Sequence, residues 1–399
     1  MRVGYLIPEF PGQTHVFFWR EIVALRARGV TVRLLSTRRP AGSCRHEFAA
    51  AAAAETHYLF PPRFSALRRW VARRAPGLAG GLQYLNSLSP RGPKARLRSL
   101  AFLASAIDLL EYARAERLDH IHAHSCADAA HVVALCRKLG GPPYSLTLHG
   151  DLDVYGTDHR LKMEGAAFIA AVGSHLVRQV VSEVGLPQDR LLATCMGVDT
   201  LRLAALDLKP STRAGQLRIA TVARLNRMKG HLHALAAVRR AMDQGVDIEY
   251  TIAGEGEYRP EIEKCVQALA LGDRVHLVGT LSESEVLSLL SRTDAFVLAS
   301  VGAGEAWPVS VMEAMGAGVP VISSVIGATP EMITSGLDGI LVEQRDEAGL
   351  AAAMVHLARD QQARIRMGEN ARATAQRRFE VSVTAGRLLQ ALDGASSPL

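Results

Sequence analysis

Two glutamates that stand eight residues apart, Glu305 and Glu313, mark the stretch whose residue types and spacing could best do chemistry. Pro308 lies between them, and because proline suits the first position of a helix, we expect a helix to begin there. The backbone amides at its start, at about Val309 and Ser310, would favour an anion such as a phosphate. The two carboxylates could accept hydrogen bonds from hydroxyl-bearing rings at both ends of one extended ligand. An ion-paired helix glutamate beside an ordinary loop glutamate would show the same sequence pattern, so both interpretations stay open.

Two cations stand in another strand-to-helix connection, "VARLNRMKG". Arg224 would end the strand, and Lys229 would open the helix that follows. A planar guanidinium and a compact ammonium beside fresh helix amides could together hold a diphosphate. An arginine at a strand end is often only a salt-bridge partner, but Arg224 would point toward the same cleft as Pro308. We therefore favour the diphosphate interpretation.

Histidines follow two expected strands, in "HIHAHS" and "YSLTLHG". His149 could donate a hydrogen bond to a ligand hydroxyl or could cap the next helix, and Asp151 stands close behind it. His122 and His124 would share one strand face, as metal ligands can. No third ligand stands at a useful spacing, so we interpret them as strand-end polar residues and expect no metal site.

The elements that would position these residues alternate as short β-branched runs and longer amphipathic segments, which is typical of parallel α/β sheets. A polar linker that contains proline and glycine, residues 203–216, separates two such series. We predict an α/β chain of two facing, doubly wound, Rossmann-like domains, with a ligand cleft at the carboxyl ends of the strands. The expected strands cover residues 2–8, 30–36, 120–125, 144–150, 167–173 and 190–196, then 217–224, 247–254, 274–279, 294–300, 319–324 and 338–342.

The composition is that of a globular protein, with 399 residues, 48% of them hydrophobic and 21% charged. This length suits two domains. No apolar run is long enough to span a membrane, and the first residues read as a buried strand rather than a signal peptide, so we expect a cytoplasmic protein. The five scattered cysteines indicate reduced thiols. The turn "AGEGEY" fails the G-x-G-x-x-G pattern, so no nicotinamide cofactor is expected.

Positive charge is concentrated in the first half of the sequence. Residues 1–205 hold 26 Lys and Arg against 16 Asp and Glu, whereas the remainder holds 20 against 23, so the net charges are +10 and −3. In residues 58–100, and above all around Arg68–Arg74, arginines alternate with Phe, Trp and Leu. Such a segment can lie on an anionic membrane surface or can be a solvated helix that caps the sheet, and both interpretations stay open. No recognition motif accompanies the charge, so nucleic acid is not an expected partner.

These pieces resemble the retaining glycosyltransferases of family 4, which have the GT-B fold. The resemblance covers most of the chain and rests on Arg224, Lys229 and the E-x7-E spacing in "GEAWPVSVMEAMGAGVPVI". The first half, with "GQTHVFFWREIVALRARGVTV", "HIHAHS" and "LHGDLDVY", is similar to a bacterial branch that builds exopolysaccharide and colanic-acid-like repeat units. The implied organisation is an acceptor-binding domain over 1–205, a nucleotide-sugar-binding domain over 206–378, and a segment over 379–399 whose helix, at about Phe379–Leu392, crosses back to the first domain.

The resemblance also implies roles for single residues. Arg224 and Lys229 would bind the donor diphosphate and Glu313 the nucleotide ribose, while Glu305 would contact hydroxyls of the transferred sugar. His149 would lie against that sugar, so the implied catalytic residues are His149, Glu305, Arg224 and Lys229. Further donor contacts would come from Gly12, Gly279, Thr280, Leu281, Ala306, Trp307, Pro308, Val309 and Ser310. The backbone of residues 279–281 would contact the nucleotide base. The acceptor side would include Gln13, His15, His124 and Asp151.

Two departures from the family pattern stand at these sites. The N-terminal loop reads "FPGQTH", where relatives of this branch more often have "SETF", so Gln13 and His15 replace an acid and an aromatic residue. "GEAWP" carries Trp307 where many members have a smaller aromatic residue followed by glycine. The first departure concerns the acceptor, and the second concerns the choice of donor.

The implied activity is transfer of a sugar from a nucleotide diphosphate sugar, UDP- or GDP-linked, with retention at the anomeric carbon and without a metal or cofactor. The expected acceptor is a glycan, lipid-linked at the inner membrane face, and a soluble natural product such as an aminocyclitol is the alternative. Three competing activities remain: a glycoside hydrolase that uses two carboxylates, a nucleotide-sugar epimerase, and a non-catalytic adaptor for membrane or nucleic acid. A hydrolase would have no use for a diphosphate site at Arg224 and Lys229.

Overall fold

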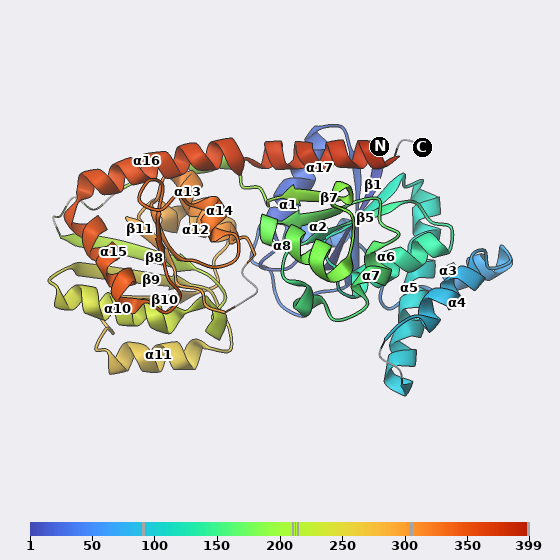
Figure 1. Cartoon of the computed structure of the whole chain (residues 1–399), viewed down its shortest axis with the longest axis horizontal. Helices are drawn as coiled ribbons and strands as arrows, with labels where there is room; N and C mark the ends of the chain where they lie inside the picture. The colour runs from blue at the N-terminus through green and yellow to red at the C-terminus, as the bar shows by residue number, and fades with distance from the viewer. Residues whose placement is uncertain (90–91, 210, 212, 214, 303–305, 397–399) are drawn as a thin grey trace. The chain divides into compact units, whose positions relative to one another are not determined.

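The computed structural model describes residues 1–396 except 90–91, 210, 212, 214 and 303–305. The chain forms two compact units (Figure 1). Unit 1 comprises residues 1–195 together with 384–399, and unit 2 comprises residues 196–383. Each unit is built around one parallel sheet, so the α/β class predicted from the sequence is confirmed.

Unit 1 contains a seven-stranded parallel sheet in the order β3-β2-β1-β4-β5-β6-β7. The central strands are buried almost throughout, because helices cover both faces of such a sheet and leave no polar face to alternate with. Helix α6 packs on β1, β4 and β5, and α1 packs on β2. The strands are β1 (Arg2–Glu9), β2 (Thr31–Arg38), β3 (His57–Tyr58), β4 (His120–Ala123), β5 (Tyr144–Leu148), β6 (Ile169–Val172) and β7 (Leu191–Thr194).

The helices of unit 1 include two that flank the strands of the candidate site. Helix α1 (Val16–Ala27) follows β1, and α6 (Asp128–Lys138) follows β4. The sequence pattern predicts helices over residues 14–28 and 128–139, so both are confirmed, although α1 begins two residues later than expected. The other α-helices are α2 (Ala49–Glu55), α3 (Phe64–Ala72), α4 (Leu78–Asn86), α5 (Pro93–Glu116), α7 (His159–Met163), α8 (Ser174–Gln179) and, from residue 384 onward, α17 (Val381–Ser396).

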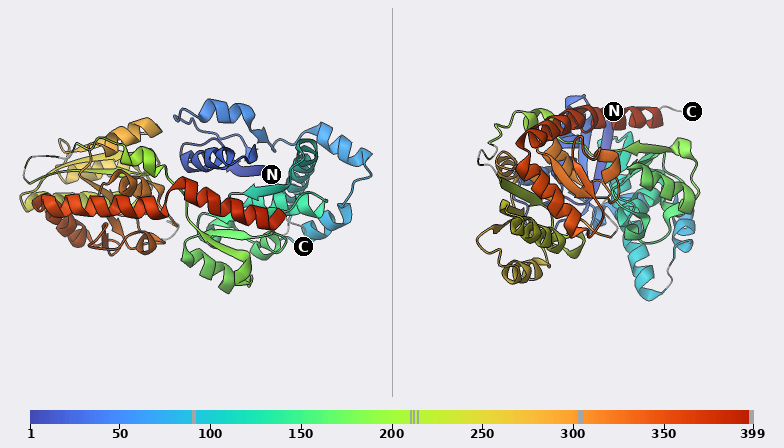
Figure 2. Two further views of the ribbon diagram at one scale, coloured as in Figure 1. Left: turned by 90° about the horizontal axis from the view of Figure 1, so that it is seen from above. Right: turned by 60° about the vertical axis from the view of Figure 1, so that its left-hand side comes forward.

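Helices α3, α4 and the start of α5 form an arm that extends away from the sheet of unit 1 (Figures 1 and 2). Two buried acids of α5 hold α3 in place. Glu111 accepts from Arg73 at 2.8 and 2.9 Å and from Arg114 at 2.9 Å, and Asp108 accepts from the backbone amide of Arg63 at 2.9 Å. Part of the positive charge counted in the sequence is therefore used within the arm.

Unit 2 contains a six-stranded parallel sheet in the order β10-β9-β8-β11-β12-β13. Helices α10 and α15 pack on each other, and α13 packs on β11 and β12. The strands are β8 (Gln216–Val222), β9 (Asp247–Ala253), β10 (Val275–Gly279), β11 (Ala295–Leu298), β12 (Val321–Ser324) and β13 (Ile340–Val342). The helices are α9 (Thr200–Ala204), α10 (His231–Asp243), α11 (Arg259–Ala268), α12 (Glu283–Leu290), α13 (Val309–Ala317), α14 (Thr329–Met332), α15 (Glu347–Arg359) and α16 (Gln361–Arg378).

The boundaries between units differ from the expected ones. Unit 1 ends at residue 195 instead of 205, because α9 packs on α13 and α16 of unit 2. At the other end, unit 2 continues to residue 383 rather than 378. The carboxylate of Glu380 ties this segment to α9 by accepting from the amide of Thr200 at 3.0 Å. Every expected strand is present, and among the described residues only the two-residue edge strand β3 was not predicted.

Candidate active site

The turn after β8 carries the two cations that the sequence singled out. Arg224 lies in this turn with an exposed side chain, and Lys229 ends a short 3-10 turn, Arg227–Lys229. Gly230 follows in the left-handed conformation, with φ of 65°, and α10 begins directly after it. The sequence thus delivers both cations to one end of the sheet, where the carboxyl end of β8 meets the start of a helix.

A second glycine-containing turn supports the one that carries Arg224. The amide of Leu225 donates to the carbonyl of Glu255 at 2.9 Å, and the amide of Tyr258 donates to the carbonyl of Leu225 at 3.0 Å. Gly254 has a φ of 143°, and a Cβ there would overlap the carbonyl oxygen of Ala223. The turn "AGEGEY" therefore needs glycine for close backbone packing. The comparison with the dinucleotide-binding motif did not predict this role.

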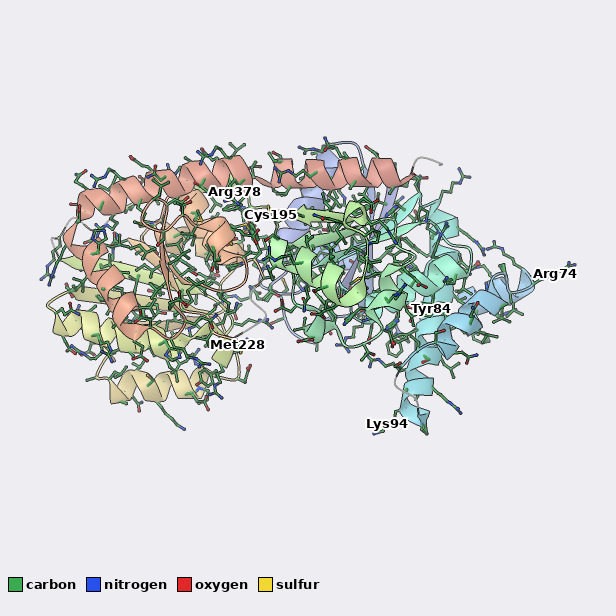
Figure 3. The ribbon with its side chains drawn as sticks, viewed as in Figure 1. Arg74, Tyr84, Lys94, Cys195, Met228 and Arg378 are labelled. Atoms are coloured by element: carbon green, nitrogen blue, oxygen red, sulfur yellow. The ribbon has the colours of Figure 1, made fainter. Side chains whose placement is uncertain are left out.

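The turn with Lys229 is also tied to the loop that leads to Glu305. The amide of Val301 donates to the carbonyl of Met228 at 2.8 Å, and the amide of Gly302 donates to Gln344 Oε1 at 2.8 Å. Gly230 packs so closely on the backbone of Ala299 that a Cβ would overlap its carbonyl oxygen. Met228 marks the position of this turn in Figure 3. These contacts fix the two loops against each other.

Replacing Gly230 with alanine should destabilise unit 2 by about 2–4 kcal/mol, because the new methyl group adds a steric clash to the strain of a left-handed residue. Gly245→Ala is the matched control, since Gly245 also has a positive φ, 87°, but has open space around it. We expect the control to cost only about 1 kcal/mol. Urea unfolding followed by circular dichroism compares the two variants. Equal losses of stability would show that the packing on Ala299 is not tight.

Helix α13 begins at Val309, one residue after the position expected from the sequence. Pro308 is extended, with φ of −70° and ψ of 113°, and therefore precedes the helix as its N-cap. Its carbonyl accepts from the amides of Val311 and Met312 at 3.2 and 3.4 Å. The amides of Val309 and Ser310, which have no partner within the helix, remain directed out of its first turn.

Of the two glutamates singled out in the sequence, only Glu313 lies among the described residues. Glu313 lies in the second turn of α13, and only 7% of it is exposed. Glu305 lies outside the described residues. Trp307, in contrast, is buried: its indole N–H donates to Met312 Sδ at 3.0 Å, and its ring meets Phe379 edge-on at 5.9 Å. Ala306 is buried as well. The side chain of Trp307 thus contributes to packing.

The segment expected at the nucleotide base begins with the last residue of β10. Gly279 has a φ of 75°, and its carbonyl accepts from the amide of Gly254 at 2.8 Å. Thr280 and Leu281 are half-buried, and Leu281 lines a hollow of about 540 Å³ beside Arg218, Thr251 and His276. This hollow is not lined by Arg224, Lys229 or Glu313, so it is separate from the cation-bearing turn.

In unit 1, the side chains of His124 and His149 meet at the carboxyl ends of neighbouring strands. Nδ1 of His124 lies 3.1 Å from Nε2 of His149, and the rings are nearly parallel with centroids 5.4 Å apart. The amide of His149 donates to the Tyr155 hydroxyl at 2.8 Å. Phe18 packs edge-on against both histidines, with centroids at 4.8 and 5.3 Å. Burial lowers the pKa of both imidazoles to about 3, so both are neutral near pH 7.

The structure also explains His122, which the sequence pattern paired with His124. The His122 ring is fully buried, with Nδ1 at 2.7 Å from Ser145 Oγ and Nε2 at 2.9 Å from Thr147 Oγ1. Both ring nitrogens are therefore satisfied inside the sheet. His122 is thus a buried structural residue rather than a strand-end one. Within the described part of the chain, no group of three or more His, Cys, Asp or Glu side chains could hold a metal ion.

The N-terminal loop holds its polar residues in internal contacts. The amide of Gly12 donates to His15 Nδ1 at 3.1 Å. Gln13 Oε1 accepts from the amide of Arg45 at 2.9 Å, and its backbone carbonyl lies 2.7 Å from His46 Nε2. These bonds shape the loop, so a contact of the Gln13 side chain with an acceptor would require their rearrangement. Asp151 lies 3.8 Å from His175.

Known protein families match both units. The family Glycosyltransferase Family 4 matches residues 15–202, and the family Glycosyl transferases group 1 matches residues 207–374. The chain belongs to glycosyltransferase family 4. Among the residues that the structure describes, no helix of this glycosyltransferase is long and apolar enough to cross a membrane.

Similar proteins support this assignment over nearly the whole chain. The family-4 chain is 28% identical over 376 residues to a protein named colanic acid biosynthesis glycosyltransferase WcaL from Escherichia coli, which covers 88% of this chain and 89% of WcaL. It is 32% identical over 225 residues to the amylovoran biosynthesis glycosyltransferase AmsK from Erwinia amylovora, or 55% of this chain and 54% of AmsK.

Solved structures confirm the GT-B fold. Anabaena HepE in complex with UDP superimposes with a TM-score of 0.73 at 17% identity, over 99% of this chain and 100% of HepE. A glycosyltransferase from Rickettsia africae gives a TM-score of 0.75 at 15% identity, over 100% of this chain and 99% of the other. At these identities the likeness concerns the fold.

Two residues of the family-4 chain that sequence reasoning missed lie beside Arg224. His231 Nε2 lies 3.2 Å from the carbonyl of Arg224 and pairs with it by donating its proton. Its Nδ1 is then a bare acceptor, and it is buried without a partner among the described residues, as is Oδ1 of Asn226. Both residues stand within "RLNRMKGH", next to the selected cations, so proximity in sequence was the available signal.

Proposed function

We propose that this glycosyltransferase moves a sugar from a nucleotide diphosphate sugar, UDP- or GDP-linked, onto a glycan of a bacterial exopolysaccharide. The observation that carries the proposal is the turn at Arg224 and Lys229, which is packed against the loop before α13. The relatives support it by their names, since WcaL and AmsK are named for colanic acid and amylovoran biosynthesis. HepE supports the donor class, because it is known in complex with UDP-glucose.

We assign the donor diphosphate to Arg224, Lys229 and the amides of Val309 and Ser310. Cations and helix amides that are held in place before the reaction stabilise the negative charge that develops on a leaving diphosphate. Glu313 is assigned to the ribose and Glu305 to the transferred sugar. In unit 1, His149 is assigned to a sugar hydroxyl, and the residues around His124 and Asp151 are assigned to the acceptor.

The transfer is proposed to proceed with retention and without a metal or cofactor. The departing phosphate would take the proton of the attacking hydroxyl on the same face of the sugar, and Arg224 and Lys229 would supply the charge that a metal supplies in other transferases. NMR of the product gives the configuration at the anomeric carbon, and turnover in the presence of a chelator tests the role of a metal. Inversion, or loss of turnover with the chelator, would contradict this part.

The direct test of the proposed activity is release of the nucleoside diphosphate from the nucleotide sugar with and without a glycan acceptor. We expect release to depend on the acceptor and a new glycosidic bond to appear in the product. Conversion of the donor sugar without an acceptor would indicate an epimerase. Cleavage of a glycoside without a nucleotide would indicate a hydrolase. Transfer to an aminocyclitol rather than a lipid-linked glycan would point to a soluble natural product as acceptor.

We further propose that the arm formed by α3, α4 and the start of α5 contacts an anionic membrane surface. Its apolar side chains are unusually exposed, with Phe64 at 74% and Leu97 at 71%. Other exposed apolar side chains of the arm are Leu67, Val71, Leu78, Leu82 and Leu100. Arg74 and Lys94 lie at the ends of the arm and point outward (Figure 3). Exposed apolar groups among cations are typical of surfaces that bind lipid head groups.

Reversing two exposed charges, as in Arg68→Glu with Arg74→Glu, should weaken binding to phosphatidylglycerol vesicles at least thirtyfold, because each basic residue near the surface contributes about 1 kcal/mol. Arg160→Glu with Arg178→Glu makes the same change in net charge elsewhere in unit 1 and serves as the control. Vesicle co-sedimentation at low salt measures both. Equal weakening in the two double variants would contradict a docking role for the arm.

A further inference from the structure

Four polar side chains from four elements of unit 1 form a continuous line. The hydroxyl of Tyr5, in β1, donates to Glu21 Oε1, in α1, at 2.6 Å. The same oxygen lies 3.4 Å from Nε2 of His124, which follows β4. Nδ1 of His124 then lies 3.1 Å from Nε2 of His149, which follows β5. The backbone amide of His124 donates to the carbonyl of Leu6 at 2.9 Å and so fixes the middle of the line.

The positions of the protons along this line follow from the groups at its start. Burial raises the pKa of Tyr5 well above its usual value, so its hydroxyl is protonated and donates to Glu21. Burial raises the pKa of Glu21 too, but Oε1 already accepts from Tyr5 and so offers only lone pairs, with or without a proton on the other oxygen. Nε2 of His124 therefore faces Oε1 as an N–H group. The 3.4 Å contact is electrostatic rather than a well-aligned hydrogen bond, yet the opposite tautomer would set a lone pair against the carboxylate.

The same reasoning determines which nitrogen of His149 carries the proton. A neutral imidazole carries one proton, so His124 with Nε2–H has a bare Nδ1 that must accept. Nε2 of His149 lies 3.1 Å from that atom and can pair with it only as an N–H donor. Nδ1 of His149 is then a bare acceptor, and it is screened from solvent with no partner among the described residues.

The groups that surround the line are consistent with two neutral rings. His122 lies edge-on against His124 with centroids 4.6 Å apart, and its nitrogens are occupied by Ser145 and Thr147. The centroid of the Phe17 ring lies 5.5 Å from that of His149. Each ring therefore has a single proton near pH 7, and its tautomer is a definite property of the site.

We propose that Glu21 and His124 are positioning residues that hold His149 as its Nε2–H tautomer, so that Nδ1 accepts a hydrogen bond from a sugar hydroxyl. The inference rests on the proposed function and deepens it. It reverses the expectation from the sequence that His149 donates to the sugar. A buried acceptor without a partner is costly. Because Nδ1 is screened from solvent, a hydroxyl would reach it through a small movement of the half-buried His149 ring and would remove that cost only in the bound state.

The tautomer can be read directly from the full-length chain. With ¹⁵N-labelled histidine, a long-range proton–nitrogen correlation distinguishes the protonated from the bare ring nitrogen, and His149→Asn assigns the signal among the 14 histidines. We expect the Nε2–H form of His149 in the unaltered protein. His124→Gln should preserve it, because Glu21 accepts from the amide nitrogen and thereby turns the amide oxygen toward His149. His124→Phe and Glu21→Leu should yield a mixture of both tautomers.

Kinetics gives the second readout. We expect His124→Phe and Glu21→Leu to lower kcat/KM about tenfold, the effect of one misdirected hydrogen bond, and His124→Gln to restore most of it. Glu116→Leu is the control, since Glu116 pairs with Arg33 at 2.8 Å outside the line. Nδ1–H in the unaltered protein, or the same single tautomer in His124→Phe, would overturn the proposal. If the tautomers behave as expected in a protein that transfers no sugar, the positioning inference survives while the proposed function fails.

Discussion

Replacing Lys229 with alanine is expected to lower kcat/KM about 10²–10³-fold, the usual loss when one fixed group that stabilises a leaving anion is removed. Lys229 ends the turn that packs on the backbone of Ala299. Its ammonium would add a point charge next to the amides of α13, and alanine leaves only Arg224 and those amides to hold the diphosphate. Affinity for UDP, measured by calorimetry, should fall as well.

Arg227→Ala is the matched control for Lys229→Ala, because Arg227 is an exposed cation at the start of the same turn. Removing it lowers the net charge equally and tests whether any nearby cation suffices. We expect less than a threefold change in kcat/KM for the control. Equal losses in both variants would mean that the turn attracts anions by its overall charge and has no specific diphosphate contact.

Substitutions of the two glutamates should have different effects, one on the affinity for UDP and the other on kcat. Glu313→Gln is expected to weaken UDP affinity about 10–100-fold, because a charge-assisted hydrogen bond to the ribose contributes roughly 1.5–3 kcal/mol. Glutamine keeps the shape of this buried side chain, so the fold of α13 should be retained. Glu305→Gln should leave UDP affinity nearly unchanged and lower kcat about 100-fold, since a contact with the transferred sugar acts on the reacting part of the donor.

Calorimetry with UDP and steady-state kinetics with a nucleotide sugar measure this separation. Glu343→Gln, at an exposed position of the same unit, controls for the loss of one negative charge. If Glu305→Gln and Glu313→Gln weakened UDP binding equally, the assignment of one carboxylate to the sugar and the other to the ribose would be wrong.

The fold was predictable because both sheets are parallel and covered on both faces. Strands such as β6 and β12 are buried throughout, so their apolar runs stand out between polar turns. The unit boundary was harder to place, because the packing of α9 on α13 is a contact between residues far apart in the sequence. Leu203 illustrates this, since its side chain lies where a Cβ on Gly316 would be.

The site was predictable where charged residues follow strands and only partly predictable elsewhere. Arg224, Lys229 and the start of α13 stand at strand ends, where parallel sheets collect functional groups. Glu21, in contrast, lies in the middle of an amphipathic helix, and nothing in its neighbourhood along the chain distinguishes it from a solvated residue. Its contacts with Tyr5 and His124 come from the arrangement of β1, α1 and β4.

The central claim is that unit 2 binds a nucleotide diphosphate sugar, and a thermal-shift screen of the whole protein tests it most directly. The screen compares UDP-, GDP-, dTDP- and ADP-sugars with the unaltered chain and with Lys229→Ala. A ligand at about 100 times its Kd stabilises the folded state by about 2.7 kcal/mol, which raises Tm by a few degrees. The account predicts a shift with one nucleotide class that is lost in Lys229→Ala. No shift with any of the nucleotide sugars would contradict it.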